Sequence, residues 1–232
     1  MKIAVSMIAL NEEEFIENAV KSCRFADYLC VVDGGSKDKT IPTIKDSLPD
    51  GVELILDNKK WADHFSEQRQ AAYDIIPDDV DWWMRLDADE MYSGMFVDSA
   101  REVLEALPEE ILAIKIRQTN LFPDPDHYAA NLGGFEAHPR IFRHIKNEYG
   151  YHQWTGQVHE YVQVMSLAGL NPIPHDLMVV WNAQVFHFGW LSHKRREERE
   201  RLYSTMDGSG VTSVGDLTGR HFEVRDLPVE LA

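Results

Sequence analysis

The sequence predicts an α/β protein with a mostly parallel sheet flanked by helices. Short apolar runs alternate with segments of helical apolar spacing throughout residues 1–92, and this repeated strand–helix order produces parallel sheets with right-handed crossovers. The apolar runs are short, as expected for strands buried on both faces. Several of them end at a polar or acidic residue, where such sheets bind their ligands.

The first elements follow from these patterns. An apolar run predicts a strand over 3–10, and apolar positions at helical spacing predict a helix over 15–23. Asn11 is expected to cap that helix. A second strand is predicted over 28–32, followed by a short helix with Pro42 in its first turn, where proline is favoured.

The same alternation continues through the next segment. A third strand is predicted over 52–56, and a helix follows over 65–76 with Asp63 as its cap. A fourth strand over 82–86 completes the parallel series. Apolar spacing then predicts one more helix over 96–107.

The second half of the chain is less regular. Alternating or apolar runs predict strands over 111–117, 140–143 and 178–180, and a charged helix is predicted over 192–206. Prolines and glycines make residues 118–176 rich in loops. The arginines at the two ends of the 140–143 strand face opposite sides and are expected to be solvated at a sheet edge.

Composition bounds the class of protein. The chain has 232 residues with a formal net charge of −16, a balance that disfavours general nucleic-acid binding. Two cysteines, Cys23 and Cys30, are too few for a disulfide framework and favour a cytoplasmic location. No apolar stretch reaches the ~18 residues that a membrane span needs, so no membrane span is expected.

The strand ends carry the candidate chemistry. Asn11, Asp33, Asp57 and Asp87 follow the four predicted parallel strands, and these ends should meet at one edge of the sheet. Repelling carboxylates at one edge are tolerated when a cation or a hydroxyl-rich ligand lies between them.

The strongest local signal is the segment Leu86-Asp87-Ala88-Asp89-Glu90. If this segment is extended, Asp87 and Asp89 project to the same side and face one ligand together. Paired carboxylates suit Mg²⁺ or Mn²⁺, which in turn bind phosphate oxygens. The chain contains neither G-x-G-x-x-G after its first strand nor a P-loop motif, so Rossmann dinucleotide and P-loop sites are disfavoured.

Four segments together carry a family resemblance. Ala9–Glu13, Val31–Thr40, Trp61–Arg69 and Leu86–Glu90 resemble glycosyltransferase family 2. The resemblance implies the GT-A fold, a Rossmann-like mostly parallel sheet, with the loop-rich C-terminal region binding the acceptor. It also implies transfer of a sugar from a nucleotide-diphosphate donor, of the UDP or GDP type, with inversion at the sugar carbon.

The resemblance implies roles for individual residues around the nucleotide. Asn11 and Glu13 would line the nucleotide pocket, and Asp33 would meet the base or the ribose. Asp63 and Arg69 would border the same pocket.

It further implies a site for a divalent cation, Mn²⁺ or Mg²⁺. Asp87 would face the ribose or the metal, and Asp89 would ligate the metal beside the diphosphate. His187 would be a late ligand to the same metal.

The catalytic base is expected in the second half. This family usually supplies the base from a Glu-Asp pair, and the nearest counterpart here is Val158-His159-Glu160. Glu160 is the expected base, with His159 as its catalytic neighbour or as a group on the metal side. His159 and His187 also fit purely structural roles.

The expected organisation has three parts. Residues 1–92 form the nucleotide-sugar-binding half, 93–206 the acceptor-binding and catalytic half, and 207–232 a C-terminal tail. The expected function is therefore metal-dependent transfer of one sugar to an unknown acceptor. A nucleotidyltransferase and a non-catalytic nucleotide-sugar binding module remain the alternatives.

Overall fold

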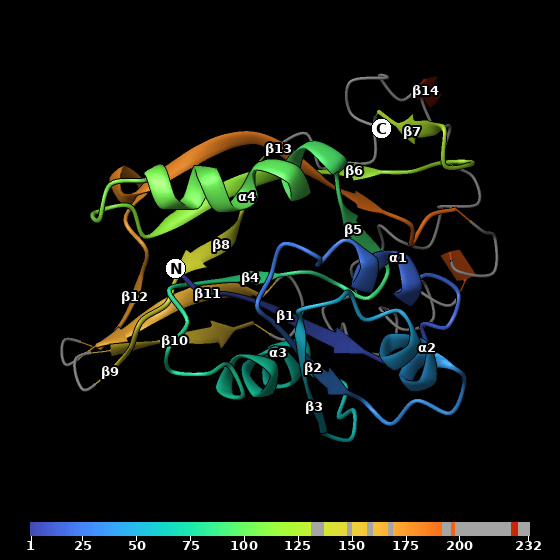
Figure 1. The fold of residues 1–232 in the computed structure, drawn as a ribbon, viewed down its shortest axis with the longest axis horizontal. Coiled ribbons are helices and arrows are strands. Elements are labelled where there is room, and N and C mark those ends of the chain that lie inside the picture. The colour runs from blue at the N-terminus through green and yellow to red at the C-terminus, as the bar shows by residue number, and fades with distance from the viewer. Residues whose placement is uncertain are drawn as a thin grey trace.

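The computed structural model of the chain describes residues 1–130, 137–147, 150–156, 160–166, 169–191, 196–197 and 224–226. Its main sheet contains eight strands, which are β1 (Ile3–Ala9), β2 (Tyr28–Asp33), β3 (Glu53–Asn58), β4 (Trp82–Arg85), β5 (Glu90–Tyr92), β6 (Ala113–Asn120), β8 (His138–Arg143) and β13 (Met178–His187). The order across the sheet is β3-β2-β1-β4-β8-β6-β13-β5. Figure 1 shows this sheet running through the molecule.

The sheet is mixed but mostly parallel. β1 pairs in parallel with β2 and β4, β2 with β3, and β6 with β13. β8 lies antiparallel between β4 and β6, and β5 lies antiparallel against β13. The α/β class with a mostly parallel sheet is therefore confirmed.

Helices cover both faces of the sheet, and they are α1 (Ile16–Lys21), α2 (Thr40–Asp46), α3 (Phe65–Asp74) and α4 (Gly94–Ala106). Apolar residues of α1, α2 and α4 share one core with one face of β1, β2 and β4. In Figure 1, α4 lies along β13 and β6. Tyr73 of α3 packs with Trp83 in the core of the opposite face. All residues of β2 and all but one of β1 are buried, which confirms that these strands are enclosed on both faces.

A second sheet lies in the region that was expected to be rich in loops. Its strands are β9 (Lys146–Asn147), β10 (Gly150–Thr155), β11 (Tyr161–Ser166) and β12 (Gly169–Pro172), in the order β12-β11-β10-β9. A small ladder pairs β7 (His127–Ala129) with β14 (Val224–Asp226), and a short 3₁₀ helix η1 (His175–Leu177) precedes β13. The expectation of a loop-rich region is wrong for β10 and β11, because Trp154 and Val162 add apolar surface to the second core.

Two expected helix caps are also wrong. Asn11 does not cap α1, whose N-cap is Phe15; Asn11 instead takes a positive φ of 56° and turns toward the loop after β2. The N-cap of α3 is His64 rather than Asp63, since the His64 ring accepts a hydrogen bond from the backbone N–H of Glu67. The observed cap lies four residues after the expected one for α1 and one residue after it for α3.

The expectation that the arginines of β8 are solvated at an edge is wrong for Arg140. β8 lies between β4 and β6 inside the sheet, and Arg140 is 1% exposed. The expected helix over 192–206 lies outside the described residues except at 196–197, which are helical. Of the expected tail over 207–232, the structure describes only β14.

Within the part of the chain that the structure describes, no helix has both the length and the apolar character needed to cross a membrane.

Candidate functional site

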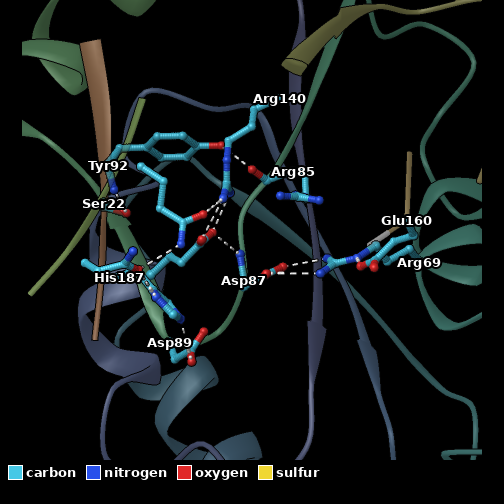
Figure 2. A network of polar contacts seen from close by, with 12 residues as sticks. Ser22, Arg69, Arg85, Asp87, Asp89, Tyr92, Arg140, Glu160 and His187 are labelled. Atoms are coloured by element: carbon cyan, nitrogen blue, oxygen red, sulfur yellow. Dashed lines mark hydrogen bonds and ion pairs between the residues drawn. The ribbon is translucent and has the colours of Figure 1, made fainter. Parts of the chain in front are cut away.

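The segment between β4 and β5 forms a tight turn at the centre of the candidate site. The backbone N–H of Glu90 donates to the carbonyl of Asp87 at 3.0 Å, and the N–H of Asp87 donates to Glu90 Oε2 at 3.0 Å. The expected extended conformation of residues 87–89 is therefore wrong. As Figure 2 shows, Asp87 and Asp89 point toward different partners.

Asp87 is bound to Arg69 of α3. The Arg69 guanidinium donates from Nη1 to Asp87 Oδ1 at 2.5 Å and from Nη2 to Oδ2 at 3.0 Å, while its Nε donates to Glu160. Arg69 is 6% exposed, so these charges meet away from bulk water. Arg69 thus joins the acidic turn to the expected base (Figure 2).

The pKa values of both carboxylic acids respond to this cation. Burial raises the pKa of Asp87, but the Arg69 and Arg85 guanidinium groups outweigh burial and hold that pKa well below its usual range. Burial also raises the pKa of Glu160, and Arg69 again outweighs it, so that the pKa is lowered. Both groups are carboxylates at neutral pH.

Glu90 and Arg140 form a second buried ion pair. Arg140 donates from Nη1 to Glu90 Oε2 at 2.6 Å and from Nη2 to Oε1 at 2.8 Å, and both residues are 1% exposed. Because Glu90 also accepts from the Asp87 backbone, this pair fixes the shape of the turn.

Strand pairing brings Asp89 beside His187. β5 pairs with β13 so that Glu90 lies opposite His187, and the Phe188 N–H donates to the Asp89 carbonyl at 2.9 Å. The Asp89 Oδ2 atom then lies 3.3 Å from His187 Nε2. His187 also lies in parallel register with Asn120 of β6.

Asn120 sets the orientation of the His187 ring. The ring Nδ1 lies 2.7 Å from Asn120 Oδ1, and an amide oxygen only accepts hydrogen bonds, so Nδ1 carries the proton. In the neutral ring the Nε2 lone pair then faces the Asp89 carboxylate. This contact is favourable when a proton, as in an ion pair, or a metal cation lies between the nitrogen and the carboxylate, and metal-binding histidines use the second arrangement.

Gly189 leaves space beside the Asp89 Oδ2 and His187 Nε2 atoms. A Cβ at this position would lie 2.6 Å from His187 Nε2 and 2.8 Å from Asp89 Oδ2, closer than real contacts allow. Among the described residues no group of three or more His, Cys, Asp or Glu side chains could hold a metal ion. Two protein ligands still suit Mg²⁺ or Mn²⁺, because such ions are completed by substrate phosphates and water. The residues present therefore fit a divalent cation that is bound together with a diphosphate.

The residues expected to bind the nucleotide at the ends of β1 and β2 form hydrogen bonds with the loop that follows β2. The Asn11 side chain accepts from the Lys37 N–H at 2.9 Å, and Glu13 accepts from the Lys39 N–H at 3.0 Å. Asp33, 3% exposed, accepts from the backbone of its own loop at Ser36 at 2.9 Å. These side chains therefore hold the rim of the sheet in shape, and contact with a nucleotide remains a prediction for all three.

The remaining expected residues are more scattered. Asp63 has a positive φ of 56° and accepts from the Trp61 indole at 2.9 Å, on the loop that follows β3. Asp57 is exposed and accepts from its own neighbour Asn58. His159 lies outside the described residues, so its role beside Glu160 stays a prediction.

Sequence reasoning missed three residues of the site. Arg85 is the last residue of β4 and precedes Asp87 by two positions, and this closeness in sequence was its only signal. Asn120 and Gly189 gave no local signal, because only the pairing of β6 and β13 brings them to His187. Trp154, whose ring lies near Arg69 and Arg85, is 6% exposed and packs in the second core.

Comparisons with solved structures give similar chains of greater length. Staphylococcus aureus TarS 1–349 in complex with UDP-GlcNAc matches with 16% identity and a TM-score of 0.45, covering 53% of this chain and 36% of that one. Mycobacterium tuberculosis glucosyl-3-phosphoglycerate synthase in complex with Mg²⁺ and UDP matches with 24% identity and a TM-score of 0.37, covering 50% of this chain and 43% of that one. The chain thus spans less than half of each of these two solved chains.

A family model extends over most of the described sheet. No curated protein matches the chain. The model of glycosyl transferase family 2 matches residues 4–169, which include all four motifs of the sequence. The match extends from the second residue of β1 to the first residue of β12, and β13 of the main sheet lies beyond it. The mostly parallel sheet flanked by helices agrees with the GT-A fold expected for such a chain. The chain therefore belongs to glycosyl transferase family 2.

Proposed function

We propose that this chain transfers one sugar, with inversion, from a nucleoside-diphosphate donor to a hydroxyl group of an acceptor. The observation that carries the proposal is the pair formed by Asp89 Oδ2 and His187 Nε2 at 3.3 Å, beside the space left by Gly189. In a member of this family, a divalent cation held there would neutralise the charge of the leaving diphosphate.

The residues of the chain would divide the remaining work. Asn11, Glu13, Asp33 and Asp63 would shape the nucleotide pocket at the rim of β1, β2 and β3. Arg69 would hold Asp87 and Glu160 in place through its two ion pairs. Its position between them supports a single site that joins the donor side to the base.

Glu160 would accept the proton of the acceptor hydroxyl. The acceptor oxygen forms its bond to the sugar carbon while the bond from that carbon to the diphosphate oxygen breaks, and the proton moves to the Glu160 carboxylate. The lowered pKa keeps Glu160 ionised at neutral pH, which is the state that a base needs.

The test is calorimetric titration of UDP, GDP and CDP into the protein with and without Mn²⁺. We expect one of these nucleotides to bind at least tenfold more tightly with Mn²⁺, and Asp89→Asn to remove that gain. Asp46→Asn, an exposed control at the end of α2, should keep it. An unchanged Mn²⁺ dependence in Asp89→Asn would refute the metal site.

Turnover of nucleotide sugars then separates the alternatives. Slow release of the nucleoside diphosphate from a bound nucleotide sugar would support a transferase. Binding without any release would instead favour a non-catalytic binding module. A nucleotidyltransferase would release pyrophosphate from a nucleoside triphosphate, and it would need a basic glycine-rich loop where this chain has Asn11–Glu14.

A further inference from the structure

Three arginines lie around the acidic turn, and two of them have carboxylate partners. Arg69 is paired with Asp87 and Glu160, and Arg140 with Glu90. Arg85 has no ion pair among the described residues, and its buried Nε atom has no hydrogen-bond partner there. Arg85 is therefore a cation in the site whose Nε donor has no acceptor among the residues that the structure describes.

The surroundings of Arg85 include an aromatic ring and two further cations. The side chain is only partly buried, with its guanidinium carbon 5.7 Å from the centre of the Trp154 ring. Burial and the neighbouring Arg140 and Arg69 cations lower the pKa of Arg85 to about 10, so the group still carries its charge at neutral pH. A buried N–H without an acceptor is costly in a folded protein, and an arriving acceptor group would remove that cost.

The position of Arg85 indicates which ligand it meets. Figure 2 shows Arg85 between Arg140 and the Arg69–Glu160 pair, with Asp89 and His187 on the other side of Asp87. The proposed cation, and with it the donor diphosphate, belongs to the side of Asp89. Arg85 also lies close enough to the proposed base to contribute to the lowered pKa of Glu160, and near that base the acceptor must place its hydroxyl.

We propose that Arg85 binds an anionic group, a phosphate or a carboxylate, on the acceptor. This inference rests on the proposed function, because it assigns the acceptor to the side of Glu160. Both anions match the planar fork of a guanidinium, which offers them two parallel N–H donors. The acceptor class is therefore a hydroxyl compound with a phosphate or carboxylate close to the reacting hydroxyl.

The test separates the acceptor side from the donor side. The protein is first saturated with UDP and Mg²⁺, or with whichever nucleotide proves to bind, and then titrated with glycerol 3-phosphate, glycerate and uncharged glycerol. Arg85→Gln, Arg85→Lys and the wild type are compared, and Arg24→Gln removes one exposed arginine elsewhere as a matched charge control. Thermal melting confirms that each variant is folded.

We expect one of the two anions, but not glycerol, to bind the wild type. Arg85→Gln should weaken this binding at least tenfold and leave nucleotide affinity unchanged, whereas Arg85→Lys should recover part of it and Arg24→Gln should change nothing. If the wild type binds neither anion, or if Arg85→Gln binds it equally well, the proposal is wrong. A loss of nucleotide affinity with no loss of anion affinity would assign Arg85 to the donor diphosphate and also overturn it.

Failure of the proposed function gives a different result. If none of the nucleotides binds the wild type, the donor site is refuted, and the anion titration of the nucleotide-free protein still tests Arg85. If Arg85→Gln fails to fold, Arg85→Lys decides: its anion affinity must differ from that of the wild type, and identical affinity counts against the proposal.

Discussion

Gly189 shows how one residue without a side chain determines what its neighbours can bind. Any Cβ at this position would approach His187 Nε2 and Asp89 Oδ2 at distances below 3 Å. Since Nε2 and the Asp89 Oδ2 atom lie 3.3 Å apart, the same small volume is where the proposed cation would contact both atoms. Gly189 is thus part of the proposed metal site although it supplies no ligand.

Replacing Gly189 tests this role. We expect Gly189→Ala to weaken Mn²⁺ binding at least tenfold, because the added methyl group occupies the ion's place or separates the two ligands. Electron paramagnetic resonance of free Mn²⁺ measures the affinity directly. Gly94→Ala, at an open position in α4, is the matched control and should bind Mn²⁺ as the wild type does.

Glu160 provides a second test at this scale. Glu160→Gln keeps an oxygen that can accept from Arg69 but cannot take up a proton, so nucleotide affinity should stay unchanged while sugar transfer falls by about 100-fold or more. Calorimetry and a turnover assay measure the two quantities separately. Transfer at the wild-type rate would mean that another group is the base.

At the scale of elements, the turn between β4 and β5 depends on an ion pair from a different strand. Arg140 of β8 holds Glu90, and Glu90 holds the Asp87 backbone. The side chains on either side of this turn, Asp87 and Asp89, are the ones assigned to the site. The stability of the turn and its function are therefore expected to change together.

Arg140→Met should destabilise the fold, because it leaves Glu90 as a buried charge without its partner. The expected loss is about 3–5 kcal/mol in the free energy of unfolding, measured with urea. The double variant Glu90→Leu/Arg140→Met should recover part of this loss, since it removes both buried charges. A double variant less stable than Arg140→Met would contradict this account.

Much of the element structure was predictable because it depends on local apolar spacing. The four parallel strands and their helices follow from such spacing, and the strands predicted over 111–117 and 140–143 are found at 113–120 and 138–143. The second sheet was missed because the prolines and glycines of residues 118–176 indicated loops, whereas Trp154 of β10 and Val162 of β11 pack with Trp83 in the second core.

The site was predictable only in part for the same reason. Asp89 and His187 were expected together from the family resemblance, and the pairing of β5 with β13 explains how they meet. The buried position of Arg140 could not be predicted, because no local pattern in residues 138–143 indicates that β8 lies antiparallel between β4 and β6. The positions of both His187 and Arg140 thus depend on strand pairing between distant segments of the chain.

For the molecule as a whole, the ion pairs of Arg69 are expected to make the free energy of unfolding depend on pH in the acidic range. The pKa values of Asp87 and Glu160 are lowered in the folded state, so the folded state binds fewer protons than the unfolded state in acid. Their contribution is fully present above the unfolded pKa values, about 4, and it is lost as the pH falls through the folded values.

We therefore expect the free energy of unfolding to fall steeply below about pH 4. Urea titrations between neutral pH and pH 3 measure this slope. Arg69→Met should flatten it, because both carboxyl groups then lose the cation that lowers their pKa values. Arg24→Gln, which alters one exposed pair, should retain the wild-type slope. An equal slope in Arg69→Met would show that other groups govern acid unfolding.

The late arrival of β13 in the chain has a consequence for biosynthesis. Asp89 emerges from the ribosome early, but His187 follows only after the whole second sheet has been translated. A nascent chain thus has half of the proposed cation-binding pair and none of the strand that brings the second half beside it. Chelation of Mn²⁺ or Mg²⁺ by this pair would accordingly mark the completion of translation through Gly189, and shorter ribosome-bound intermediates should remain incapable of loading the ion.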